Sequence, residues 1–210
     1  YALLHLRRQV RDPALRAKLV PDFPIGAKRV LFNDDYYPTL NRGNVRLVTD
    51  PIDSIVADGV CTKSGERFAA DVLIYATGFM ATDFLAPMTI AGTGGHALSE
   101  EWRQGARAYL GVTVSGFPNL FMLYGPNTNL GHNSILVMIE AQVGYIIDAI
   151  RQLDEHGLRR LDVKRAVMDE YNRVLQQDLA KSVWAADKQS WYKLADGTIT
   201  NNWPHNTMRY

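Results

Sequence analysis

Asp71-Val-Leu-Ile-Tyr-Ala-Thr-Gly-Phe79 is the stretch that decides how the rest of this 210-residue chain is interpreted. Its first half is an apolar run, which predicts a buried β-strand from Val72 to Tyr75. Thr77 and Gly78 follow at once, and a glycine permits the tight turn that ends such a strand. The stretch therefore predicts a sheet-containing domain with buried strands, of the α/β class.

Working outward, short β segments are expected on both sides of this run. Asp58-Gly59 between apolar residues is a strong hairpin signal, and Gly125-Pro126 ends a later apolar run. A further strand is expected where an apolar run follows Gly26, with Lys28 and Arg29 at its mouth. The other expected strands are Val45 to Val48, Ser54 to Val56, Val60 to Thr62 and Leu120 to Tyr124.

Helices are expected at both ends of the chain. Residues 1–19 predict two short helices separated at Asp12-Pro13. A long helix is predicted from Ile135, capped by Asn133 or Ser134 and ended by Gly157. Its expected inward residues are Ile135, Ile139, Val143, Ile146, Ile150 and Leu153. A second helix is predicted from Arg165 to Val183, with Val167, Tyr171, Val174, Leu175 and Leu179 inward.

Composition excludes several classes of function. The 23 Lys and Arg residues nearly cancel the 22 Asp and Glu residues, so no nucleic-acid partner is expected. The single cysteine, Cys61, excludes an internal disulfide, and five scattered His residues give no metal-ligand spacing, so no metal site is predicted. The apolar tract from Ile135 to Ile150 is interrupted by Glu140, Gln142 and Asp148, so no membrane span is expected. These features favour a cytoplasmic protein that acts on small molecules.

Two motif matches are set aside. The Gly92–Ala97 segment matches Gly-x-Gly-x-x-Ala, but a short strand precedes it and a polar, glycine-broken segment follows, which disfavours a nucleotide site. The chain contains no Gly-x-Ser-x-Gly sequence, which removes the usual hydrolase interpretation. By contrast, a strand, the Gly125-Pro126 turn and the start of the long helix together predict a pocket with unpaired backbone N–H groups. Such a pocket suits an electron-rich oxygen.

Six segments in this order resemble the C-terminal part of the class B flavoprotein monooxygenases, most closely the Baeyer-Villiger monooxygenases. The resemblance spans essentially all 210 residues. The segments are Phe23 to Arg29, Asp34 to Tyr37, Asn41 to Val48, Asp71 to Phe79, Tyr109 to Asn127, and Ser190 to Tyr192.

The resemblance implies an enzyme in which NADPH reduces FAD and a C4a-peroxyflavin inserts one oxygen atom from O2 into a ketone. Arg29 corresponds to the active-site arginine of the family, and Lys28 to the lysine that contacts the 2'-phosphate of NADPH. Trp191 is expected beside the nicotinamide and the substrate. The remaining cofactor-binding residues implied by the resemblance are Thr77, Gly78, Asn133, Ser134 and Ile135.

The expected fold is α/β, an incomplete flavoprotein with two dinucleotide-binding domains. Residues 1–25 are interpreted as the remnant of a helical subdomain, residues 26–68 as the C-terminal half of the NADP-binding domain, and residues 69–210 as the C-terminal part of the FAD-binding domain. No dinucleotide-binding Gly-x-Gly-x-x-Gly turn opens the chain. We therefore expect an N-terminal remainder of the same enzyme as a partner, and an isolated chain that is inactive and exposes apolar surfaces.

Two alternatives stay open. The first is a flavin-containing monooxygenase that oxygenates nitrogen or sulfur, for which Lys28 and Arg29 would be unnecessary. The second is an inactive truncated fragment that acts only as an interaction module. The sequence does not identify the substrate, because the pocket depends on loops and on domains outside the chain.

Overall fold

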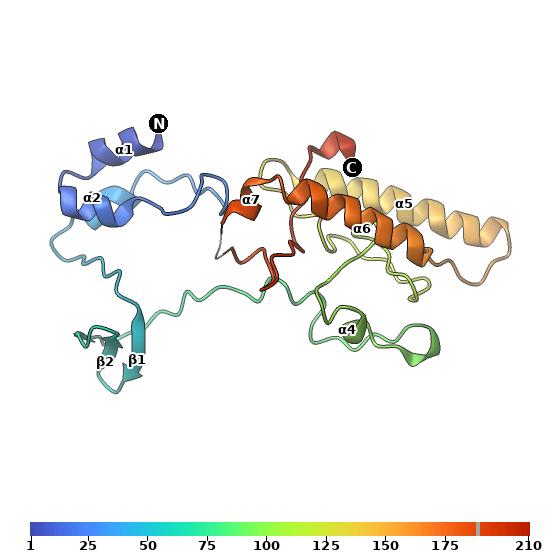
Figure 1. The fold of residues 1–210 in the computed structure, drawn as a ribbon, viewed down its shortest axis with the longest axis horizontal. Helices are drawn as coiled ribbons and strands as arrows, with labels where there is room; N and C mark the ends of the chain where they lie inside the picture. Colours follow the sequence, from blue (N-terminus) through green and yellow to red (C-terminus); the bar gives the residue numbers. More distant parts are fainter. Residues whose placement is uncertain (188–189) are drawn as a thin grey trace. The chain divides into compact units, whose positions relative to one another are not determined.

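The computed structural model describes residues 1–187 and 190–210 of the chain, which form two compact units (Figure 1). The first unit contains residues 1–22 and 31–79. The second contains residues 23–30 and 80–210. Helices and one small sheet together make a partial α/β fold, which confirms the predicted fold class.

The first two helices of the first unit are separated at Asp12-Pro13, where the sequence predicts a break. Helix α1 (Ala2–Gln9) is followed by α2 (Pro13–Leu19), and a short α3 (Tyr36–Leu40) comes later. The Asp12 carboxylate accepts a hydrogen bond of 2.9 Å from the Ala14 N–H, and Pro13 occupies the first helical position. Proline is favoured there because that N–H would have no helical partner, so the two predicted N-terminal helices are confirmed.

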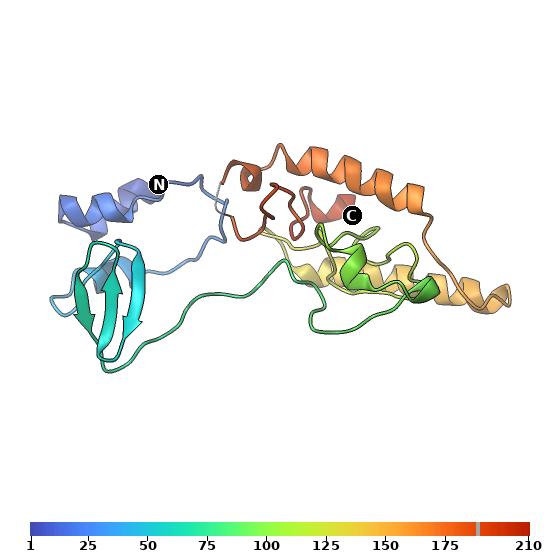
Figure 2. The same cartoon turned by 60° about the horizontal axis from the view of Figure 1, so that its bottom comes forward.

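One antiparallel sheet, with strand order β1-β2-β3, completes the first unit. Its strands are β1 (Ile52–Val56), β2 (Gly59–Thr62) and β3 (Arg67–Ala69). The β1–β2 hairpin turns at residues 57 and 58, with Val56 paired to Gly59, as the Asp-Gly signal predicts. Figure 2 shows the three strands side by side. The sequence does not predict strand β3, because its three residues carry no apolar alternation.

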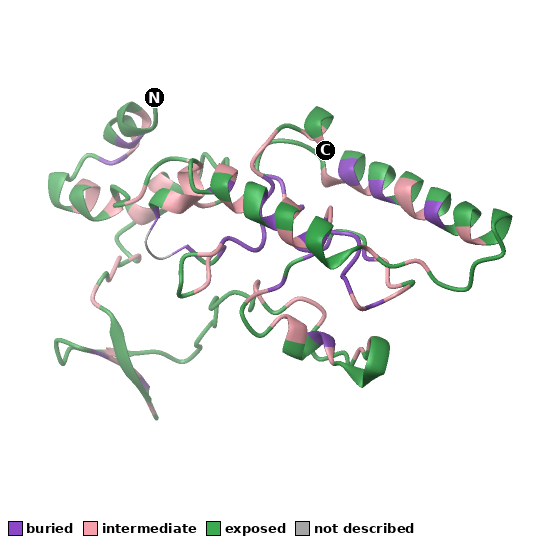
Figure 3. Cartoon of the chain, turned by 45° about the vertical axis from the view of Figure 1, so that its right-hand side comes forward, coloured by how far each residue is buried: buried purple, intermediate pink, exposed green. Residues whose placement is uncertain are grey.

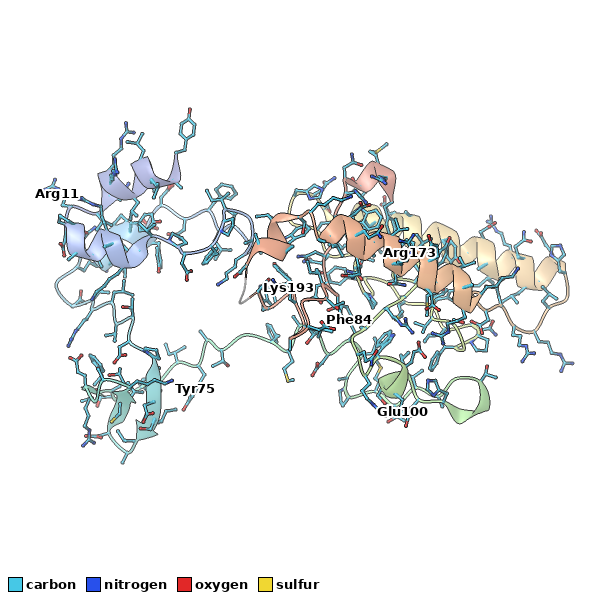
Figure 4. All side chains as sticks on the ribbon, in the orientation of Figure 1. Arg11, Tyr75, Phe84, Glu100, Arg173 and Lys193 are labelled. Carbon is cyan, nitrogen blue, oxygen red and sulfur yellow. The ribbon has the colours of Figure 1, made fainter. Side chains whose placement is uncertain are left out.

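The other predicted strands are not formed in the structure, so these predictions are wrong. Residues 72–75 and 45–48 belong to no strand or sheet, and neither do the apolar runs after Gly26 and before Gly125. On the central run, Val72 is 74% exposed and Ile74 is 89% exposed, and Figure 4 labels Tyr75 on the same stretch. A strand forms only when a neighbour pairs its N–H and C=O groups. Among the described residues, no segment supplies that neighbour to these runs.

The second unit holds two hydrophobic clusters, each of which includes a side chain of α6. One cluster centres on Met168, packed with Leu98 and Val114. The other joins Met138 to Leu179. Residues of the C-terminal tail complete this second cluster, and Figure 2 shows the tail between the two long helices. The elements of the unit are η1 (Thr93–Gly95), α4 (Leu98–Glu101), α5 (Ile135–Glu155), α6 (Arg165–Leu179), α7 (Val183–Ala186) and η2 (Thr207–Arg209).

Helix α5 has the predicted ends and part of the predicted inward face. Four of the predicted inward residues are partly buried, namely Ile135, Ile139, Ile146 and Leu153. Ser134 caps its start, and Gly157 follows its end with φ +62°, where the Leu158 N–H donates 2.8 Å to the Leu153 carbonyl. The buried residues are Met138, Gln142 and Ala149. The predicted inward residues Val143 and Ile150 are instead exposed. Figure 3 shows buried residues along one side of α5 and exposed residues along the other. The helix carries two apolar stripes, and periodicity alone does not decide between them.

Helix α6 is shorter than predicted. It ends at Leu179 rather than Val183, because the Ser182 N–H and hydroxyl both donate to the Leu179 carbonyl, at 2.9 and 2.6 Å. Leu175 and Leu179 are buried as predicted and Tyr171 is partly buried, whereas Val167 and Val174 are exposed. Met168 and Asn172 are buried in their place.

Candidate functional site

The two candidate basic residues lie on a segment that belongs to the second unit. Within the Phe23–Val30 segment, Ala27 is fully buried, while Arg29 is exposed. The Lys28 ammonium lies 4.1 Å from the centre of the Phe23 ring, a cation–π distance. Burial of Ala27 and the contact between Lys28 and Phe23 hold the segment that contains Arg29.

Arg29 is within electrostatic reach of Tyr192. Burial raises the pKa of the Tyr192 hydroxyl, and the positive charge of Arg29 partly opposes that rise. Trp191, the adjacent candidate, packs its ring on Tyr192 with centroids 4.7 Å apart and planes 32° apart. The charge of Arg29 therefore acts on Tyr192, the neighbour of Trp191, although neither Lys28 nor Arg29 is among the residues that line the cavity next to these rings.

A cavity of about 200 Å³ opens beside this pair of aromatic rings. Four aromatic side chains dominate its wall, and two asparagine amides supply polar groups; we call it the aromatic cavity. Phe84, labelled in Figure 4, is one of the four. An apolar wall with few polar groups is typical of a site for a small organic molecule. The lining residues are Ala81, Phe84, Tyr124, Gly125, Asn129, Trp191, Tyr192 and Asn201.

The loop of residues 124–129, which forms one wall of the aromatic cavity, has a strained backbone. Tyr124 and Asn127 both have φ +58°, in the left-handed region that non-glycine residues rarely adopt. Gly125 lies so close to Gly111 that a Cβ atom on it would be 2.2 Å from the Gly111 carbonyl oxygen. Such strain persists only where surrounding contacts impose it, and it gathers at functional sites.

The C-terminal tail supplies those contacts. The Asn127 amide donates to the Ile199 carbonyl at 2.7 Å and to the Asn202 carbonyl at 3.2 Å. Backbone bonds run from the Asn127 N–H to the Thr200 carbonyl and from the Asn129 N–H to the Asn201 carbonyl, at 2.7 and 2.9 Å. The tail therefore holds the loop in place along its length.

Side-chain amides connect this loop to the rest of the cavity wall. The Tyr124 hydroxyl donates 2.8 Å to the Asn129 side-chain oxygen, and the Asn129 amide donates 2.7 Å to the Asn202 side-chain oxygen. The Asn201 amide donates 3.0 Å to the Ala81 carbonyl on another side of the cavity. None of these asparagines is among the residues predicted from the sequence. For Asn201 and Asn202, the signal is the segment Thr-Ile-Thr-Asn-Asn at residues 198–202, inside an aromatic-rich tail.

The three candidates at the start of α5 do not line the aromatic cavity. The Ser134 hydroxyl accepts 3.3 Å from the Leu136 N–H as the helix cap, and the Asn133 amide donates 2.9 Å to the Thr207 hydroxyl. Ile135 packs partly buried against the cluster around Met138. In the structure, Ser134 caps the helix and Asn133 bonds the C-terminal tail at Thr207.

Thr77 and Gly78 belong to the first unit, and both are exposed. Gly78 has φ +82°, a conformation that glycine adopts without strain, but no turn is formed at residues 76–79.

The described residues contain no group of three or more His, Cys, Asp or Glu side chains that could hold a metal ion. Over the same residues, no helix combines the length and the apolar character that a membrane crossing requires.

Comparison with known proteins covers the whole chain. It is 40% identical over 211 residues to a Baeyer-Villiger monooxygenase of Pseudomonas aeruginosa, matching 100% of this chain and 40% of that protein. It is 44% identical to the FAD-binding monooxygenase ktnD of Aspergillus niger, over 98% of this chain and 34% of that protein. No family model matches the chain.

Solved structures give the same result. The crystal structure of OTEMO in complex with FAD and NADP superimposes with a TM-score of 0.89 and 30% identity, over 99% of this chain and 40% of that one. Oxidised steroid monooxygenase bound to NADP superimposes with a TM-score of 0.85 and 33% identity, over 98% of this chain and 40% of that one. The chain thus spans about 40% of the length of these relatives.

Proposed function

Because this chain is related along its whole length to the Baeyer-Villiger monooxygenases, we propose that the complete protein uses FAD and NADPH to insert one oxygen atom from O2 into a ketone. The single observation that carries this proposal is the alignment of essentially the whole chain, in sequence and in structure, with flavin-dependent monooxygenases. FAD, when bound, would supply the redox chemistry and the activation of O2.

The described residues fit part of such a cofactor site. Arg29 is an exposed, permanently charged side chain whose charge acts on Tyr192 of the cavity wall, and its planar fork suits the stabilisation of negative charge that develops on oxygen. Lys28 offers a point charge for the phosphate of NADPH. Trp191, 48% exposed, offers a flat ring face against which a planar group can stack. The aromatic cavity would exclude water from the reacting ketone.

FAD binding requires more polypeptide than these residues provide. We propose that Thr77, Gly78, Asn133, Ser134 and Ile135 contact the flavin only in the complete protein. The exposed run of residues 71–79 would then pair with strands supplied by the remaining 60% or so of the relatives' length, with residues 1–25, 26–68 and 69–210 in the domain roles predicted from the sequence. A cytoplasmic location is part of the same proposal.

Replacement of Arg29 tests the reaction. In the complete flavoprotein, Arg29→Ala should lower ester formation from a ketone by about 100-fold or more, because a preorganised donor for the developing oxyanion is lost. Oxygenation of a thioether by the same variant should survive in part, since it develops no such oxyanion. Product analysis by gas chromatography measures both reactions.

The matched control is Arg151→Ala, which removes an exposed arginine on α5 and should leave both reactions within about twofold. If the unsubstituted protein oxygenates amines and thioethers but never ketones, a flavin-containing monooxygenase replaces our proposal. If Arg29→Ala matches Arg151→Ala in ester formation, Arg29 has no catalytic role.

A further inference from the structure

A buried glutamine on α5 reaches the wall of the aromatic cavity through the backbone of Tyr124. Gln142 is 1% exposed, in a helix whose neighbouring positions are mostly apolar. Its side-chain oxygen accepts a hydrogen bond of 3.0 Å from the Tyr124 N–H, and its amide donates 2.8 Å to the Tyr210 hydroxyl. A buried amide with both ends engaged is a specific connector, because each lost bond leaves a buried polar group unpaired.

The bond from Gln142 pairs a backbone N–H of the loop that has no backbone partner in the part of the chain that the structure describes. Tyr124 has φ +58°, and no backbone carbonyl of the described residues is bonded to its N–H. Because the left-handed conformation is unfavourable for a tyrosine, a contact that favours it helps decide which conformation is populated. Gln142 provides that contact from a rigid helix.

The far end of the connection is also fixed. The Tyr210 hydroxyl, which accepts from Gln142, donates to the Leu110 carbonyl. Burial raises the pKa of Tyr210 to about 12, so the hydroxyl keeps its proton at neutral pH and both bonds persist. On the cavity side, the Tyr124 hydroxyl holds Asn129, which itself lines the cavity.

We propose that Gln142 is a positioning residue for the aromatic cavity: it holds the strained backbone of Tyr124, and through it the Tyr124 ring and Asn129, in the arrangement that binds the organic substrate. The consequence for activity rests on the proposed monooxygenase function. The consequence for the Tyr124 backbone rests on the geometry alone.

The test uses two variants of the complete flavoprotein that each remove one end of the connection. Gln142→Met keeps the length of the side chain but removes the strong acceptor for the Tyr124 N–H. Tyr210→Phe, the matched control, removes the hydroxyl bonded to the other end of Gln142 and leaves the bond to Tyr124 in place. Gln142→Glu keeps an acceptor oxygen for the Tyr124 N–H but loses the donor to the Tyr210 hydroxyl, so it shows whether the acceptor alone is sufficient.

Hydrogen exchange at the Tyr124 amide decides the positioning claim, whatever the reaction. Exchange should become at least tenfold faster in Gln142→Met, and should stay within about threefold of the original protein in Tyr210→Phe and Gln142→Glu. Equal exchange in Gln142→Met and the original protein would overturn the proposal. Equal acceleration in Gln142→Met and Tyr210→Phe would do the same, because it indicates general destabilisation.

Steady-state kinetics decides the claim for substrate binding. In Gln142→Met, KM for the ketone should rise at least fivefold with kcat lowered by less than twofold, whereas Tyr210→Phe should change neither by more than twofold. A fall in kcat with KM unchanged would overturn this claim. If the original protein oxygenates no ketone, the proposed function fails, and the exchange measurement still decides the role of Gln142.

Discussion

At the scale of single residues, the candidate site depends on a few backbone positions that only certain side chains tolerate. A Cβ atom on Gly125 would overlap the Gly111 carbonyl oxygen, and a Cβ atom on Gly111 would overlap the Thr128 side chain, each at 2.2 Å. The absence of both atoms allows the loop that lines the aromatic cavity to fold back on residues 110–112. Asn127, at φ +58°, combines tolerance of the left-handed region with an amide that bonds two carbonyls of the tail. These residues shape the cavity without reacting chemically.

Gly125→Ala should destabilise the protein by about 2 to 3 kcal/mol, because the new methyl group would overlap the Gly111 backbone. Urea-induced unfolding measures the change. Gly144→Ala is the control: Gly144 lies inside α5, and a Cβ atom added there would meet no other atom within 4 Å, so alanine should stabilise the helix by about 0.5 to 1 kcal/mol. Similar effects of the two substitutions would contradict the close approach of Gly125 and Gly111.

At the scale of elements, a charge cluster connects α4 to α6 and to the loop that follows α4. Glu101, the last residue of α4, bonds Arg107 at 3.1 Å and forms a two-point contact with Arg165, the first residue of α6. His96 lies 3.4 Å from the same carboxylate. Burial alone would raise the pKa of Glu101, but the hydrogen bonds from Arg165 and Arg107 outweigh it and hold that pKa below its usual value.

This pKa shift predicts a pH dependence of stability. Because the folded-state pKa of Glu101 lies below the unfolded value of about 4.5, the ionised carboxylate stabilises the fold above that pH. The contribution is lost as the pH falls through the folded-state pKa. Glu101→Gln should therefore lower the free energy of unfolding by about 1 to 2 kcal/mol at pH 7. The difference from the original protein should shrink below pH 4.5, as measured by urea unfolding at several pH values.

Glu170→Gln provides the comparison for this charge cluster. Glu170 also bonds an arginine, Arg173, but both side chains are exposed on α6 (Arg173 is labelled in Figure 4). Exposed pairs of this kind contribute little, so the substitution should leave the free energy of unfolding nearly unchanged at any pH. An effect of Glu170→Gln as large as that of Glu101→Gln would show that burial of Glu101 is not the cause.

At the scale of the whole molecule, the exposed apolar residues indicate surfaces that another part of a longer protein would cover. Helix α5 leaves a stripe of large apolar side chains exposed, and the run of residues 71–79 is exposed along its full length. The chain spans about 40% of its relatives. The exposed stripe of α5 consists of Leu136, Val137, Val143, Ile147 and Ile150.

Ile147→Gln should have different effects in the two contexts. In the complete flavoprotein it should lower the free energy of unfolding by about 2 kcal/mol, because an apolar side chain loses its burial. In the isolated 210-residue chain it should change stability by less than about 0.5 kcal/mol and should reduce aggregation measured by light scattering. The isolated chain itself should be colourless and should not oxidise NADPH.

Ala141→Gln, at an exposed position of the same helix, should have little effect in either context. Equal destabilisation by Ile147→Gln in the isolated chain and in the complete protein would contradict a covered stripe. A yellow isolated chain that oxidised NADPH would contradict the need for further polypeptide.

The sequence by itself determined the elements that depend on local interactions. The Asp12-Pro13 break, the β1–β2 hairpin and both ends of α5 follow from caps and turns that act within a few residues. The ordered motifs also determined the resemblance to flavoprotein monooxygenases, which the comparisons confirm.

Tertiary structure alone decided what depends on distant partners. Whether an apolar run becomes a strand depends on neighbours to pair with, and residues 72–75 have none among the described residues. Which stripe of α5 is buried depends on the tail that packs on it. The bond between Gln142 and Tyr124 joins side chain and backbone across 18 positions, in a geometry that no local pattern specifies. Sequence patterns report what a segment can bury or cap, whereas packing decides which of those possibilities is used.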